Sequence, residues 1–135
     1  MTDTEVIRTI PPKRILVVDD GPELAKALRM ILTFGGGHRV EILQDAESAW
    51  EQYEVGKYDL IITDLKLPKM NGFELASAIK QHAPGQRIIL ITGHADLIQW
   101  DADRLSKIDL LLQKPFTFQQ LQEAVAKLFT PGRTT

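Results

Sequence analysis

Five side chains that could do chemistry stand at or next to the ends of short aliphatic runs. They are three aspartates, a threonine and a lysine: Asp19, Asp20, Asp64, Thr92 and Lys114. Carboxylates supply the oxygen ligands that a hard divalent cation such as Mg²⁺ prefers. A cation and an ammonium group beside Asp64 would favour its attack on a phosphoryl group, because positive charge stabilises the group in transfer. The pattern therefore predicts an aspartyl-phosphate site, in which the Thr92 hydroxyl donates to a phosphoryl oxygen.

Each of these residues also has a simpler explanation when it is taken alone. The aspartate pair could close a solvated strand end, Asp64 could cap a turn, Thr92 could bond its own backbone and Lys114 could extend into solvent. All five, however, stand at or next to the ends of aliphatic runs, and their chemistry is complementary. This favours a single site over five unrelated roles.

The elements that must position these residues are five short strands. Aliphatic runs predict strands at residues 14–18, 39–43, 59–63, 87–91 and 108–112. Segments with helical spacing separate them, so we expect an α/β fold with a doubly wound, five-stranded parallel sheet covered by helices on both faces. Since parallel strands share one carboxyl edge, the five side chains should meet there.

Capping patterns mark the helix boundaries. Three helix starts are predicted from Gly21 before Pro22, from Asn71 with Glu74 and from Thr117 with Gln120. The glycine triplet at 35–37 follows a helix and precedes a strand, which favours a plain turn over a phosphate-binding loop. A helix at about 95–105 is also expected.

Length and composition set limits on the class of protein. The 135 residues suffice for one domain, which we place at 14–130 between a flexible lead (1–13) and a short tail (131–135). A net charge of −2 argues against nucleic-acid or membrane-surface partners, and cysteine is absent. No apolar run approaches the roughly 18 residues of a membrane span. A cytoplasmic protein is therefore expected, which either stands alone without a further domain or is a piece of a longer chain.

Four motifs in order resemble the receiver domains of two-component response regulators, the CheY-like superfamily. They are "VVDD" (17–20), "DLKLPKMNG" (64–72), "ITGHAD" (91–96) and "QKPF" (113–116). The resemblance covers about residues 14–130. It implies a flavodoxin-like (βα)₅ fold with strand order 2-1-3-4-5.

The resemblance also implies roles for individual residues. Asp64 would accept a phosphoryl group from a histidine kinase or a histidine phosphotransfer protein. Asp20, Asp64 and the backbone carbonyl of Lys66 would ligate Mg²⁺, and Asp19 would act on it through water. Thr92 and Lys114 would contact the phosphoryl group. The Lys114–Pro115 bond would be cis. Catalysis would be limited to acceptance and hydrolysis of the protein's own phosphate.

Some positions depart from the family pattern or set its details. Leu111 stands where receivers usually carry a switching aromatic residue. This favours a modified switch, or a partner that contacts the loop after the fourth strand directly, over weak switching. Lys66 and His94 flank the predicted path of attacking water, so they could set how long the phosphorylated aspartate survives. Alternatively, Lys66 is only a solvated ammonium group and His94 only a loop residue near a helix start. Trp50 is expected to pack on the sheet. Trp100 could be either a contact residue or part of the core.

The predicted output is protein–protein contact through the surface formed by helix 95–105, strand 108–112 and the last helix, a surface that could also form a homodimer. Two other functions remain open. A receiver-like scaffold could bind partners without phosphorylation, and Leu111 is compatible with it. A Mg²⁺-dependent phosphohydrolase would need a second acid two residues after Asp64, where Lys66 stands.

Overall fold

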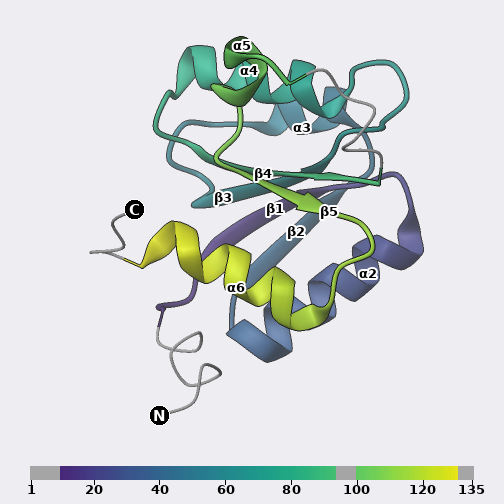
Figure 1. Cartoon of the computed structure of the whole chain (residues 1–135), viewed down its shortest axis with the longest axis vertical. Helices are drawn as coiled ribbons and strands as arrows, with labels where there is room; N and C mark the ends of the chain where they lie inside the picture. Colours follow the sequence, from purple (N-terminus) through teal and green to yellow (C-terminus); the bar gives the residue numbers. More distant parts are fainter. Residues whose placement is uncertain (1–9, 94–99, 131–135) are drawn as a thin grey trace.

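The computed structural model describes residues 10–93 and 100–130 of the chain. Within them, one parallel sheet lies between two helical layers (Figure 1). The strands are β1 (Arg14–Val18), β2 (Arg39–Leu43), β3 (Leu60–Asp64), β4 (Arg87–Thr92) and β5 (Leu110–Gln113). The helical elements are α2 (Pro22–Met30), the π-helical turn η1 (Ile31–Gly35), α3 (Ala46–Gln52), α4 (Gly72–His82), α5 (Ala102–Leu105) and α6 (Phe118–Phe129). None of these helices is long and apolar enough to span a bilayer.

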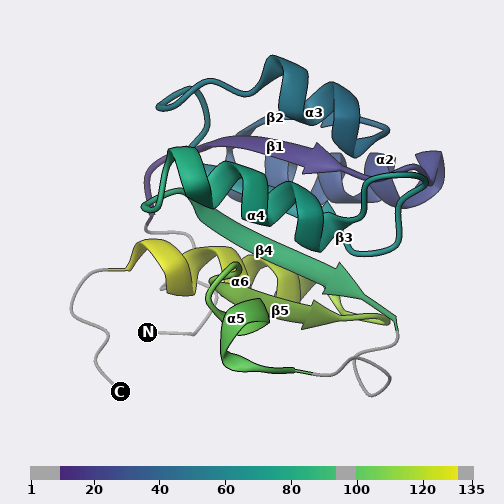
Figure 2. The same cartoon turned by 90° about the horizontal axis from the view of Figure 1, so that it is seen from above.

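The sheet has the strand order β2-β1-β3-β4-β5, and every neighbouring pair is parallel. This confirms the predicted doubly wound α/β fold and its strand order. Figure 2 shows the arrowheads of β1, β4 and β5 on the same side of the molecule. The strand order reverses between β1 and β3, and the crevice at the carboxyl ends beside that reversal is where such folds bind ligands.

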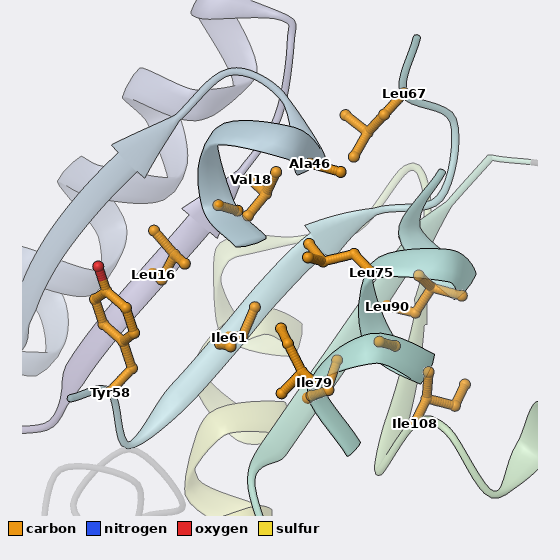
Figure 3. Packing of buried hydrophobic residues seen from close by; sticks show 13 residues of the cluster. Leu16, Val18, Ala46, Tyr58, Ile61, Leu67, Leu75, Ile79, Leu90 and Ile108 are labelled. Atoms are coloured by element: carbon orange, nitrogen blue, oxygen red, sulfur yellow. The ribbon is translucent and has the colours of Figure 1, made fainter. Parts of the chain in front are cut away.

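Alternating side chains of the strands build two cores. Leu16, Ile61 and Leu90 point to the face covered by α3 and α4, where Tyr58 and Ile108 complete the cluster (Figure 3). On the other face, strand residues including Val17 and Ile62 pack against α2, η1 and α6. Because β1, β3 and β4 are buried on both faces, their sequences are almost continuously apolar.

The helix starts follow the predicted capping chemistry. Pro22 opens α2 after Gly21. Asn71 and Glu74 form a reciprocal capping box with both hydrogen bonds at 2.9 Å. Thr117 and Gln120 form a second one at the start of α6, with hydrogen bonds of 2.8 and 3.0 Å. These bonds satisfy backbone N–H groups that have no partner within the helix.

Several boundaries differ from the sequence prediction. The described part of the expected helix 95–105 is helical only from Ala102, so a helix that includes Trp100 and Asp101 was wrong. The Asp101 carboxylate accepts the Arg104 N–H at 2.8 Å, and this cap fixes the start of α5. Residues 95–99 lie outside the described residues. The last strand begins at Leu110 and not at 108.

Specific features define the turn at 35–37 and the described residues that precede β1, 10–13. Gly37 has φ of +72°, a left-handed conformation that suits glycine at the end of a helix. Among these residues, Ile10 packs against the core that α2, η1 and α6 cover. The Lys13 N–H donates to Nδ1 of the buried His38 at 2.9 Å.

Candidate functional site

Parallel strands bring the predicted chemical residues to one edge of the sheet. Asp19 and Asp20 directly follow β1, Asp64 is the last residue of β3, and Thr92 is the last residue of β4. Lys114 follows β5, and its N–H donates to the Thr92 carbonyl at 2.8 Å, which extends the β4–β5 pairing to the site. The five side chains therefore share the crevice beside the strand-order reversal.

The three carboxylates form a compact cluster. One ligand oxygen from each of Asp19, Asp20 and Asp64 lies within 4.8 Å of the other two. Asp19 is 3% exposed and Asp64 is 8% exposed, whereas Asp20 is exposed to solvent. Like charges so close together repel unless a cation lies among them.

Asp19 carries the clearest sign that a cation fits. Its Oδ1 accepts the Gly21 N–H at 2.8 Å, while its Oδ2 is buried without a hydrogen-bond partner. Burial raises the pKa of Asp19, and the nearby Asp64 carboxylate raises it further, against a lowering effect of the Gly21 N–H. A divalent cation with oxygen ligands would satisfy this oxygen and offset the repulsion, so the residues present fit Mg²⁺.

The Asp64 carboxylate is oriented from two sides. Its Oδ2 is 3.1 Å from Lys114 Nζ, and its Oδ1 accepts the Lys66 N–H at 3.4 Å. The Lys114–Pro115 peptide bond, directly after the lysine, is cis. The ammonium group therefore stands beside the carboxylate that was predicted to be the nucleophile.

An open pocket of about 510 Å³ lies over these groups. It is lined by Asp20, Asp64, Lys66, Leu67, Pro68, Thr92, Gly93 and Lys114. Its walls combine acidic oxygens, an ammonium group and a buried threonine, so the pocket can hold a small anion beside a cation.

The loop between β3 and α4 closes tightly over Asp64. The Gly72 N–H donates to the Leu65 carbonyl at 2.9 Å. A Cβ at Gly72 would clash with the backbone oxygen of Asp64 and would lie 2.9 Å from Leu90 Cδ1, so only glycine fits there. Lys69 has φ of +63°, a left-handed conformation that residues with a Cβ rarely adopt.

The remaining sequence predictions have different outcomes. Lys66 lines the pocket, while His94 lies outside the described residues. Leu111 is half-buried, pairs with Leu90 across β4 and β5, and packs against the α3–α4 core.

Both tryptophans are half-buried against that same core. Trp50 stacks on Tyr53 with ring centroids 6.5 Å apart and meets His82 edge-on at 5.1 Å, in keeping with the expected packing role. Trp100 meets Phe73 edge-on at 5.5 Å, so it packs against α4.

Sequence reasoning missed one residue beside the site. Glu47, in the first turn of α3, accepts the Met70 N–H with its Oε2 at 3.3 Å and so contacts the β3–α4 loop. No motif or spacing in the sequence indicates this contact, because 23 residues separate the two partners. An acidic residue in the first turn of a helix is also common without any such contact.

Comparison with known proteins places the chain among signalling proteins. The family model of the response regulator receiver domain matches residues 15–126. The response regulator receiver protein CpdR of Brucella abortus is 32% identical over 119 residues, which are 86% of this chain and 96% of CpdR. A gliding motility regulatory protein of Myxococcus xanthus is 42% identical over 78 residues, or 58% of this chain, but these make up only 10% of that protein.

Solved structures agree with this assignment. The response regulator TrrA from Thermotoga maritima, in complex with Mg²⁺-BeF, is 34% identical with a TM-score of 0.76, covering 87% of this chain and 99% of TrrA. The non-phosphorylated HemR receiver domain from Leptospira biflexa is 26% identical with a TM-score of 0.77, covering 93% of this chain and 99% of that domain. With the acidic cluster, the paired lysine and the strand order described above, the chain belongs to the response regulator receiver domain family.

Proposed function

We propose that this protein is a phosphorylation-controlled switch of a two-component phosphorelay, in which Asp64 accepts a phosphoryl group. The donor would be a phosphohistidine of a histidine kinase or of a histidine phosphotransfer protein. The observation that carries the proposal is the Asp64 carboxylate, which lies 3.1 Å from Lys114 Nζ and within the cluster formed with Asp19 and Asp20.

The residues of the pocket divide the work of transfer. An Asp64 carboxylate oxygen forms the bond to phosphorus while the donor's P–N bond breaks, and the histidine ring keeps that electron pair. The Lys114 ammonium neutralises phosphoryl oxygens beside Asp64, and the Thr92 hydroxyl donates to one of them. Asp19, Asp20, Asp64 and the Lys66 carbonyl would hold Mg²⁺. When bound, the cation supplies positive charge to the oxygens of the group in transfer.

Phosphorylation would then shift a two-state equilibrium that a partner protein reads. The proposed output surface comprises α5, β5 and α6, which also offers a route to a homodimer. Leu111 lies on β5 of this surface and is packed against the α3–α4 core. A leucine has no ring to rotate, so the conformational readout here would differ from an aromatic switch.

Intact mass measurement tests the phosphoryl acceptor directly. Incubation with acetyl phosphate and Mg²⁺ should add the mass of one phosphoryl group to the wild type and none to Asp64→Asn. Asp103→Asn is the matched control, because the Asp103 side chain is 83% exposed and lies outside the site. Modification of Asp64→Asn to the wild-type level, or no modification of the wild type, would contradict the proposal.

The same samples separate the alternative functions. A receiver-like scaffold would show no modification under any condition. A phosphohydrolase would turn over a phosphomonoester many times per protein, and Lys66 at the position of the second acid argues against that outcome.

A further inference from the structure

The β3–α4 loop, residues 65–71, carries the Lys66 carbonyl that the proposed function assigns to the cation. The loop is fixed at both ends. At its start the Lys66 N–H donates to Asp64 Oδ1 at 3.4 Å, and at its close the Gly72 N–H donates to the Leu65 carbonyl at 2.9 Å. Between these points, Lys69 adopts φ of +63°. A backbone in this rarely populated region persists only where surrounding contacts hold it.

One such contact comes from the first turn of α3. The Glu47 carboxylate accepts the Met70 N–H at 3.3 Å, directly after the strained Lys69. Glu47 is itself well placed, because the Asp45 side chain caps α3 by accepting the Ser48 N–H at 2.6 Å. Met70 adds a second attachment, since its side chain packs against the α3–α4 core.

Opposite charges also lie on the start of α3 and on the loop. The pKa of Asp45 is lowered, first by the Ser48 N–H that its carboxylate accepts and further by the Lys69 ammonium. The positively charged loop residue in the left-handed conformation is thus near enough to Asp45 to act on it through charge. The start of α3 therefore contacts the loop at Met70 and acts on the neighbouring Lys69 through charge.

We propose that Glu47 is a positioning residue for cation binding. By accepting the Met70 N–H, its carboxylate holds the β3–α4 loop in the conformation that presents the Lys66 carbonyl to the ion. The inference rests on the proposed function, because the Lys66 carbonyl is assigned to Mg²⁺ there. Glu47 does not contact the ion in this scheme and acts only through the loop.

Three substitutions separate the hydrogen bond from the charge. Glu47→Gln keeps an acceptor oxygen at the same reach but removes the charge. Glu47→Asp keeps the charge but draws the oxygens back by one methylene, and Glu47→Ala removes both. Glu51→Ala is the matched control, since Glu51 is an exposed acid one turn further along α3.

Titration with Mn²⁺, followed by the electron paramagnetic resonance signal of the free ion, measures cation affinity without phosphorylation. We expect Glu47→Ala and Glu47→Asp to bind Mn²⁺ about 10-fold more weakly than the wild type, the usual scale for residues that orient ligands. Glu47→Gln and Glu51→Ala should stay near the wild type. Phosphorylation of Glu47→Ala should recover at saturating Mg²⁺.

Wild-type affinity in Glu47→Ala and Glu47→Asp would overturn the inference while leaving the phosphoryl acceptor in place. Equal weakening in Glu47→Gln and Glu47→Ala would also overturn it, because charge and not the hydrogen bond would then matter. If the wild type neither bound Mn²⁺ nor accepted a phosphoryl group, the proposed function itself would fail, and the inference with it. Thermal melts in EDTA identify any variant that does not fold, and the remaining Glu47 variants then decide.

Discussion

Replacing Asp19 by asparagine should stabilise the metal-free protein and weaken its binding of Mg²⁺. Asp19 lies almost fully buried beside two other carboxylates, and its Oδ2 has no hydrogen-bond partner. Asparagine keeps an oxygen that can accept the Gly21 N–H. It also replaces the orphaned oxygen with an amide group that can donate to the neighbouring carboxylates.

The size of the effect follows from the spacing of the charges. Two unit charges separated by the 4.8 Å that bounds the cluster repel by about 1 kcal/mol in water and about 3.5 kcal/mol at an effective dielectric constant of 20. Because Asp20 is exposed, the lower part of this range applies to it, and we expect a net gain of about 1–2 kcal/mol. For a domain of this size, that gain raises Tm by roughly 3–8 °C.

Thermal melts in EDTA and in 10 mM Mg²⁺ provide the assay. If the wild type binds Mg²⁺ with Kd on the order of 1 mM, the ion adds about 1.4 kcal/mol, but only about 0.4 kcal/mol to a variant that binds 10-fold more weakly. Asp103→Asn is the control, because it also removes one negative charge but lies away from the cluster. The reasoning is refuted if Asp19→Asn melts below the wild type in EDTA, or if Mg²⁺ stabilises both proteins equally.

Three further predictions concern Gly72 at the start of α4, the buried His38 and Lys66 in the β3–α4 loop. Gly72→Ala should lose about 2–3 kcal/mol in urea unfolding, because its Cβ would clash with the Asp64 backbone oxygen, and an unchanged midpoint would rule out that close approach. His38 has its pKa lowered by burial and by the Lys13 charge, so the unfolded chain binds the proton more readily. The contribution of neutral His38 to the free energy of unfolding should therefore be complete above pH 6.5 and be lost as the pH falls below that value. Urea melts should show a shallower fall with pH for His38→Asn, which keeps an acceptor for the Lys13 N–H. Lys66→Ala should shorten the half-life of the phosphoprotein several-fold, because the Lys66 side chain lines the pocket and its removal admits water. Equal decay of radiolabelled wild type and variant would remove Lys66 from any role in phosphate lifetime.

The sequence by itself determined the layered fold and which residues come together at the carboxyl edge of the sheet. Aliphatic runs, glycine and proline positions and capping pairs act over a few residues, so they can be interpreted locally. Once the runs were assigned to parallel strands, their shared carboxyl edge predicted that Asp64, Thr92 and Lys114 would meet. The structure agrees, because regular strands leave little freedom in where their ends lie.

Only the tertiary structure decided how those residues differ from one another. Adjacent aspartates look equivalent in the sequence, yet Asp19 is buried with an unpartnered oxygen while Asp20 faces solvent. Glu47 contacts the β3–α4 loop, and Trp100 packs on Phe73. Both contacts depend on which surfaces of separate segments come together in the fold. Such contacts join residues more than 20 positions apart, and local propensity and periodicity do not encode them.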